Sequence, residues 1–183
     1  MKIIEPSLEF IESYKAALRK GWSPNTVRPE AAAEDLEAIS KDPAAYIDSL
    51  TDLEANGAPI RLPDGSLVER LPGFIRWIWD GEFCGQVGFR WQPGTEELPA
   101  HVLGHAGYSV VPWKRRQGYA AQAFSQFLPQ LEFTGLKYIT VTIDDDNLAS
   151  QKVAEKCDAV FHDEIVKPSS YASTKSYRYR IYL

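Results

Sequence analysis

The sequence predicts a single α+β domain, in which helices flank a twisted, mostly antiparallel central sheet with one parallel β-α-β crossover. Three observations predict this class. Helical periodicity fills the first 55 residues, and strand-like segments separated by turns follow over residues 60–111. Strands and helices then alternate to the C-terminus. A chain of 183 residues suits one domain, and we expect it to span residues 1–183.

The first segment contains three predicted helices. Ser7 is expected to cap the first of them, whose apolar positions recur every three or four residues: Leu8, Ile11, Tyr14 and Leu18. Pro29 and Glu30 open the second helix. Asp42 followed by Pro43 is typical of an N-cap and a first helical position, and it predicts where the third helix begins.

The second segment reads as an antiparallel meander. Pro63-Asp64-Gly65 is a turn between two short strands, and Asp80-Gly81 is a strong hairpin signal between two longer ones. The predicted strands cover residues 60–62, 67–69, 74–79, 83–91 and 102–111.

The last segment supplies the crossover. A helix is predicted from Gln117, and Pro129 should kink it or lie near its end. A buried strand over 138–143 completes a β-α-β unit that starts at residue 102. Asn147 is a good cap for a further helix to about residue 157, and residues 159–166 and 176–183 read as two final strands.

Composition narrows the function classes. The formal charge is −5 and the positive residues are dispersed, which disfavours nucleic acid and anionic membranes as partners. Cys84 and Cys157 are too few for a disulfide framework or a metal site, so no metal cofactor is expected. The start lacks the apolar run of a signal peptide, and no segment is apolar enough to span a membrane. We therefore expect a soluble, cytoplasmic protein.

The segment with the clearest chemistry is a strand, a basic loop and a helix start, over residues 107–120. Gly118 lets the backbone approach a ligand, while Lys114 and its two arginine neighbours add positive charge. The first amides of a helix and the positive end of its dipole favour phosphate oxygens. This pattern predicts a diphosphate site. A basic loop that merely caps an ordinary helix is the alternative.

Two common phosphate sites are disfavoured. The chain lacks Gly-x-x-x-x-Gly-Lys-Ser/Thr, the P-loop motif of nucleoside triphosphatases, and it lacks Gly-x-Gly-x-x-Gly after a strand, which binds dinucleotides. A nucleotide-binding domain of another kind is left open.

The run from Arg115 to Ala120 resembles the acyl-CoA signature of the GNAT acyltransferases, Arg/Gln-x-x-Gly-x-Gly/Ala. Residues 105–111 resemble that family's fourth strand, and the resemblance covers roughly residues 74–166. It implies a GNAT-type sheet and acetyl-CoA as acyl donor. It further implies that backbone groups of two strand residues hold pantetheine and that the loop holds the pyrophosphate: Val110 and Val111, then Arg115, Arg116, Gln117, Gly118, Tyr119 and Ala120.

A second motif supports this resemblance. Asn147-Leu148-Ala149-Ser150 followed by Glu155-Lys156 is similar to the family's Asn-x-x-Ser…Glu-Lys. Asn147 would then contact pantetheine and Ser150 would line the cofactor channel. The chain departs from the pattern at Ala154, where many members carry the tyrosine that protonates the leaving thiolate. It departs again at Asp158, which replaces a glycine but tolerates a left-handed helix end.

The implied reaction is direct transfer of an acetyl group from acetyl-CoA to a primary amine. His105 is the candidate general base, because histidine titrates in the useful range and lies on the implied fourth strand. A histidine held in the sheet by hydrogen bonds is the alternative. A non-catalytic acyl-CoA sensor with the same fold is the competing function. The acceptor, the general acid, the preferred acyl length and a homodimer are left open.

Overall fold

The computed structural model describes residues 1–26, 28–62, 65–167 and 175–183. The helices are α1 (Ile11–Arg19), α2 (Ala31–Lys41), α3 (Pro43–Ser49), α4 (Tyr119–Phe127) and α5 (Leu148–Glu155), with 3-10 turns η1 (Pro112–Lys114) and η2 (Leu128–Thr134). The strands are β1 (Lys2–Ile4), β2 (Thr51–Asp52), β3 (Ile60–Arg61), β4 (Leu67–Val68), β5 (Gly73–Trp79), β6 (Phe83–Arg90), β7 (Ala106–Val110), β8 (Tyr138–Asp144), β9 (Val160–Val166) and β10 (Lys175–Tyr182).

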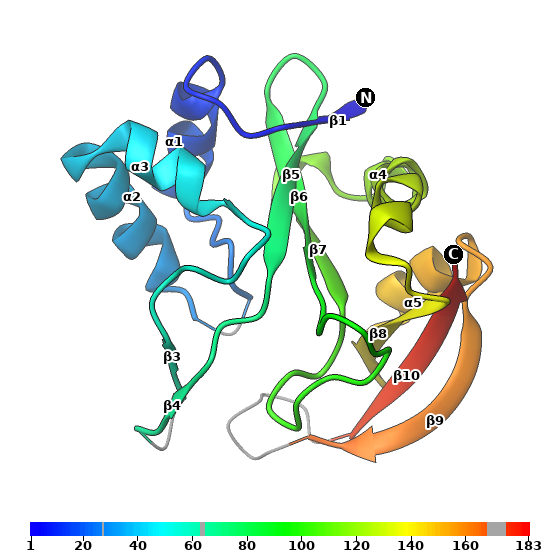
Figure 1. The fold of residues 1–183 in the computed structure, drawn as a ribbon. Helices are drawn as coiled ribbons and strands as arrows, with labels where there is room; N and C mark the ends of the chain where they lie inside the picture. The colour runs from blue at the N-terminus through cyan, green and yellow to red at the C-terminus, as the bar shows by residue number, and fades with distance from the viewer. Residues whose placement is uncertain (27, 63–64, 168–174) are drawn as a thin grey trace.

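The strands form two main antiparallel sheets. One has the order β1-β5-β6-β7, with β2 also pairing with β5, and the other has the order β8-β10-β9. Figure 1 shows α1–α3 on one side of the first sheet, and α4 and α5 on the other side together with the second sheet. The predicted α+β class is confirmed.

The predicted β-α-β unit is present as β7, α4 and β8. Its two strands do not pair with each other in a ladder among the described residues, because β7 ends one sheet and β8 begins the other. The crossover therefore joins two sheets that separate at this point. The predicted hairpin of residues 60–69 is also present as β3 and β4, although Pro63 and Asp64 of its turn lie outside the described residues.

Alternation along β5 gives the first sheet a core on each face. Phe74 and Ile78 pack with α4 and the second sheet, whereas Trp77 packs with α1 and α3. On the α1–α3 side, the hydroxyls of Tyr14 and Tyr46 both donate to Asp35 of α2, at 2.5 and 2.8 Å. These bonds tie the three helices to one another beside the sheet.

The helix starts were predicted with mixed success. Asp42 caps α3 as expected, since its side chain accepts the Ala45 N–H at 3.0 Å. The prediction for Ser7 was wrong: α1 begins only at Ile11, the Ser7 carbonyl accepts the Phe10 N–H, and Leu8 is exposed. The sequence analysis also missed β1, three residues that pair with β5.

The C-terminal half follows the sequence closely. Helix α4 ends at Phe127, and Pro129 lies in the 3-10 turn η2 that follows it. Asn147 caps α5, and Asp158 has the expected left-handed conformation after the helix, with φ 54°. Within the described ranges, no helix is both long and apolar enough to cross a membrane.

The α3 cap gives a test of local stability. Asp42→Ala should lower the free energy of unfolding by ~1 kcal/mol, because the Ala45 N–H loses its acceptor. Urea denaturation measures the change. Asp48→Ala is the matched control, since Asp48 is exposed near the end of the same helix, where a negative charge opposes the dipole. Equal losses in the two variants would contradict the capping role.

Candidate functional site

The separation of β7 from β8 begins at His105. Its backbone N–H donates to the Thr140 carbonyl at 2.8 Å, and its Nδ1 accepts the Thr140 N–H at 3.0 Å. The imidazole thus takes the place of a backbone acceptor, and a second strand-to-strand backbone bond cannot form there. Just upstream, the Thr142 hydroxyl donates to the Leu103 carbonyl. Beyond these links the two strands belong to different sheets.

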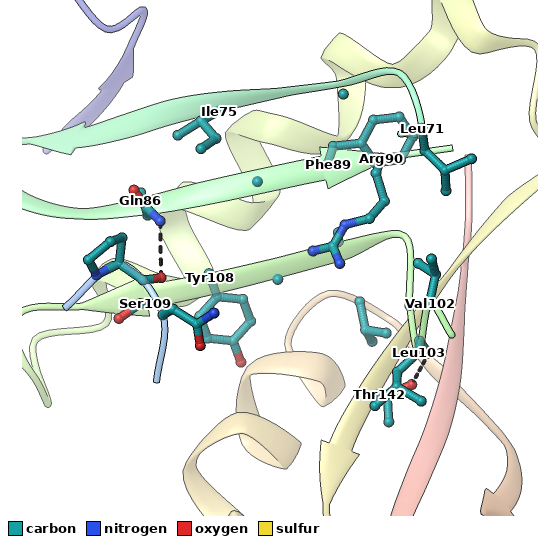
Figure 2. Close-up of a pocket in the computed structure, with 18 of the residues that line it drawn as sticks. Leu71, Ile75, Gln86, Phe89, Arg90, Val102, Leu103, Tyr108, Ser109 and Thr142 are labelled. Atoms are coloured by element: carbon teal, nitrogen blue, oxygen red, sulfur yellow. Dashed lines mark hydrogen bonds between the residues drawn. The ribbon is translucent and has the colours of Figure 1, made fainter. Parts of the chain in front are cut away.

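A cleft of ≈ 800 Å³ occupies this separation. It is lined by β6 and β7 of one sheet, by β8 of the other, by the start of α5 and by segments on the α1–α3 side. In Figure 2 the labelled side chains reach into it from several strands, with Gln86 and Ser109 toward one end of the strands and Arg90 toward the other.

The two valines at the end of β7 have opposite environments. Val111 donates its N–H to the Cys84 carbonyl of β6 and accepts from the Lys114 N–H, both at 3.0 Å. Adjacent strand residues direct their backbone groups to opposite edges, so Val110 faces the separation, where its carbonyl accepts from Arg115 Nε at 3.1 Å.

Of the two residues expected to contact pantetheine, Val110 directs its backbone groups toward the separation and Val111 directs them toward β6 and η1; the contact itself stays a prediction. The side chain of Val111 is fully buried, and both of its backbone groups are used within the protein. The sequence motif placed the two residues together, but the direction of the ladder separates their roles.

The loop before α4 has the backbone geometry of an anion site. Arg116 and Gly118 are both left-handed, with φ of 63° and 76°, and α4 begins at Tyr119. Left-handed residues beside right-handed ones turn successive amides toward one concave side, and the first amides of a helix lack acceptors in the helix. The side chains of Arg115, Arg116 and Gln117 are exposed around it, and Ala120 is partly buried in the first turn.

The positive charge of Lys114 is paired with carboxylates of the protein itself. Its Nζ lies 2.8 Å from Asp80 and 2.9 Å from Glu82, and the Tyr119 hydroxyl donates to Asp80 at 2.7 Å. Burial alone would raise the Asp80 pKa, but the bonds from Lys114 and Tyr119 outweigh it and hold that pKa well below its usual range. The β5–β6 hairpin is thereby fastened to the loop.

The second sequence motif lies across the separation from β7. The Asn147 side chain accepts the Ser150 N–H at 3.1 Å, and both residues line the cleft. The Ser150 carbonyl accepts the hydroxyl of Tyr108, which projects from β7, at 3.4 Å. Asn147 and Ser150 thus line the same cleft as Tyr108 and Ser109, the residues of β7 just before Val110. Ala154, one turn later in α5, is buried in the core.

His105 is placed differently from a solvent-accessible base. It has no exposed surface, and its ring stacks on Phe89 with centroids 6.3 Å apart. Burial, followed by the positive charge of Arg90, lowers its pKa to about 4. Its Nε2 has no hydrogen-bond partner among the described residues. This geometry favours the alternative of a histidine held in the sheet, and the catalytic role stays a prediction.

Several residues of the cleft escaped the sequence analysis. Tyr108, Gln86 and Arg90 line it, and none belongs to a recognisable motif. Ser109 of β7 lines it as well. Strand alternation predicts which face such residues occupy, but it does not reveal that the two sheets part beside that face. Within the described ranges, no group of three metal-ligating side chains gathers.

A family profile described as an acetyltransferase (GNAT) domain matches residues 22–160, most of the chain. The chain belongs to the GNAT acetyltransferase family. No curated protein sequence matches it. Solved GNAT structures are similar in fold at low identity, and three of them illustrate the range.

The first is the microcin C7 self-immunity acetyltransferase MccE in complex with acetyl-CoA and AMP, at 12% identity and a TM-score of 0.60 over 99% of this chain and 91% of that chain. The second is RimL, a ribosomal L7/L12 α-N-protein acetyltransferase in complex with coenzyme A. Its identity is 10% and its TM-score is 0.64, over 99% of this chain and 93% of that chain. The third is a putative GNAT-family acetyltransferase from Bordetella pertussis. Its identity is 15% and its TM-score is 0.56, over 97% of this chain and 93% of that chain. At such identities these similarities show the GNAT fold.

The environment of His105 predicts a pH dependence of stability. Its folded pKa lies below the unfolded value, so the unfolded chain binds the extra proton and stability is lost as the pH falls from about 6.5 toward about 4. Between about pH 7.5 and about pH 5 this single group should cost about 2 kcal/mol.

His105→Gln keeps an acceptor for the Thr140 N–H and removes the titration. Urea denaturation at both pH values should show a shallower loss for this variant than for the wild type. An unchanged pH dependence would contradict the buried, neutral imidazole. If His105 is instead the catalytic base, the same variant loses turnover at pH 7.5 together with the acidic limb of the pH–rate profile.

Proposed function

We propose that this GNAT protein is an acetyl-CoA-dependent N-acetyltransferase that acts on a primary amine. One observation carries the proposal. Strand β7 and the start of α5 line one open cleft at the point where β7 parts from β8, and the loop before α4 follows β7 directly in the chain. A CoA thioester needs an anion site for its diphosphate and an adjoining slot for its extended arm, and the arrangement fits both.

The residues divide the binding task by position. Left-handed Arg116 and Gly118, with the first amides of α4, would hold the pyrophosphate, and the arginine side chains add charge beside it. The edge of β7 at Val110 would pair with the amide groups of pantetheine. Arg115 covers the Val110 carbonyl in this structure, so it would have to release that atom. Asn147 and Ser150 would line the opposite wall.

Acetyl-CoA supplies an acetyl thioester, and the chemistry is one acyl transfer. The amine nitrogen forms a bond to the thioester carbon, the carbon–sulfur bond breaks, and the sulfur keeps the electron pair. The proton lost by the amine leaves through the cleft, and the thiolate gains a proton, so the products are an acetamide and CoA. The backbone N–H of Val110, on the free edge of β7, would stabilise the developing oxyanion.

The cofactor assignment is tested by thermal stability with acetyl-CoA, CoA, 3′-dephospho-CoA, ADP or NAD in separate samples. A ligand of the folded state adds ~2.7 kcal/mol at a hundredfold excess over its dissociation constant. We expect acetyl-CoA and CoA to stabilise the protein well beyond ADP and NAD. Stabilisation by ADP alone would instead indicate a nucleotide site. No response to any CoA species would overturn the proposal.

A pair of glycine variants localises the pyrophosphate site. Gly118→Ala and Gly135→Ala both force alanine into a left-handed conformation, with φ of 76° and 69°, and each should cost ~1–2 kcal/mol of stability. Only Gly118 belongs to the proposed pyrophosphate site at the start of α4, whereas Gly135 follows η2. Gly118→Ala should therefore weaken CoA binding at least about tenfold, and Gly135→Ala should leave it unchanged.

The Tyr108 hydroxyl is our candidate donor to the leaving thiolate. It projects from β7 to the Ser150 carbonyl, beside the wall expected to hold pantetheine, and burial raises the pKa of this phenol to about 12. It therefore carries its proton at neutral pH. Tyr108 would thus supply the proton that the family's tyrosine supplies at the position of Ala154, whose side chain is buried in the core.

Tyr108→Phe should lower kcat roughly a hundredfold or more, the range of general acid catalysis, with unchanged binding of CoA. Tyr182→Phe is the control, because Tyr182 is exposed at the end of β10. Single-turnover kinetics on the best amine of a screen, with calorimetry for CoA, separate the two effects. Full activity of Tyr108→Phe would exclude the role.

The competing function is an acyl-CoA sensor that binds without turnover. It is consistent with Ala154, which is buried and has no proton to donate. The two functions differ in one readout. The sensor binds acetyl-CoA and releases no CoA with any amine of a broad screen, whereas the transferase releases it with at least one.

A further inference from the structure

Two side chains at opposite ends of the proposed pyrophosphate loop bind the same oxygen atom. The loop is the four residues from Arg115 to Gly118, between η1 and α4. Lys114 precedes it and Tyr119 follows it, and both donate to Oδ2 of Asp80, at 2.8 and 2.7 Å. Asp80 therefore joins the two ends of the loop.

The interior of the loop supplies little to hold its own shape. Within the described parts of the chain, the backbone N–H groups of Arg116, Gln117 and Gly118 have no backbone acceptor, and all three residues are exposed. Arg116 is also left-handed, with φ 63°, a conformation that costs free energy for a residue with a side chain. Contacts at the ends of the loop must therefore keep these amides in their arrangement.

Asp80 is held in place independently of the loop. It lies in the turn between β5 and β6, which pair along their length, and β6 pairs in turn with β7. Only 14% of the Asp80 side chain and 19% of the Lys114 side chain are exposed, so water and salt screen this pair less than a surface pair. A charged acceptor also makes stronger hydrogen bonds than a neutral one. The hairpin thus offers both ends of the loop one strong, fixed acceptor.

We infer that Asp80 is a positioning residue for CoA binding, which acts through Lys114 and Tyr119 to keep the amides of residues 116–118 in the anion-binding arrangement. The inference rests on the proposed function, and it requires no contact between Asp80 and the cofactor. A loop that is free to leave this arrangement binds CoA with an affinity reduced to the fraction of molecules that retain it. Asp80 therefore orders the loop when the protein folds, so that little ordering remains for the binding step.

Glu82 of the same hairpin provides a natural comparison. Its carboxylate also pairs with Lys114, at 2.9 Å, but half of its side chain is exposed. The bond from the Tyr119 hydroxyl goes to Asp80 and not to Glu82. Glu82 thus has the same charge and the same lysine partner as Asp80, but it contacts one end of the loop only. Comparing the two acids separates loop closure from charge.

The test measures CoA binding by calorimetry for Asp80→Asn and Glu82→Gln, which have the same net charge. Asp80→Asn should raise the dissociation constant at least about tenfold, because a neutral amide is a weaker acceptor for both donors. Glu82→Gln should bind CoA as tightly as the wild type or slightly more tightly. Coulomb attraction alone predicts tighter binding for both variants, since each removes a negative charge near an anion site. The expected loss in Asp80→Asn has the opposite sign.

Tyr119→Phe tests the other end of the loop without changing the charge, and it replaces Asp80→Asn if that variant does not fold. It removes one of the two bonds and should weaken CoA binding about three- to tenfold. The double variant should bind more tightly than the product of the two single losses predicts, because both substitutions break one shared contact. With the best amine of the screen, Asp80→Asn should raise KM for acetyl-CoA and leave kcat unchanged.

Asp42→Ala, which loses only the α3 cap, controls for general destabilisation and should bind CoA like the wild type. Unchanged or tighter binding by Asp80→Asn would overturn the inference, and so would an equal loss in Glu82→Gln or in Asp42→Ala. Fully additive losses from Asp80→Asn and Tyr119→Phe would exclude the shared contact. In all these cases the wild type still binds CoA. Failure of the wild type to bind it would instead remove the proposed function and the inference with it.

Discussion

The parting of β7 from β8 is the constraint on which the rest of the site depends. It is set by His105, whose backbone and ring both bond to Thr140, so a side chain occupies the place of a ladder partner. Full burial keeps this imidazole neutral, which is the state in which Nδ1 can accept the Thr140 N–H. Beyond this link lies the open cleft that Asn147 and Ser150 line.

Two further attachments position separate parts of the chain around β7. Asp80, at the β5–β6 turn, holds Lys114 and Tyr119 and so fixes the loop before α4. On the opposite face, Trp22 holds Ser109, which places the segment after α1 above the sheet. The positively charged loop is thereby positioned by partners that need not contact a cofactor. This explains why Lys114, the first of three basic residues, is occupied within the protein.

Much of the fold could be predicted from local sequence. The Asp42 cap and the Asp80-Gly81 hairpin are encoded within a few residues, and the structure has both where the sequence predicts them. The errors arose where distant contacts decide. Ser7 has the chemistry of a cap, but α1 starts only at Ile11, and the strand before it forms only because β5 is available as a partner. The motif groups Val111 with Val110, but the direction of the Val111 backbone groups depends on its pairing with β6.

The sequence by itself determined the family and the two motifs, because a glycine at a helix start and an asparagine cap are short-range features with fixed spacing. Only the tertiary structure decided what surrounds them. Burial of His105 and the contact of the Tyr108 hydroxyl with α5 both arise between segments that are distant along the chain, so local sequence does not specify them.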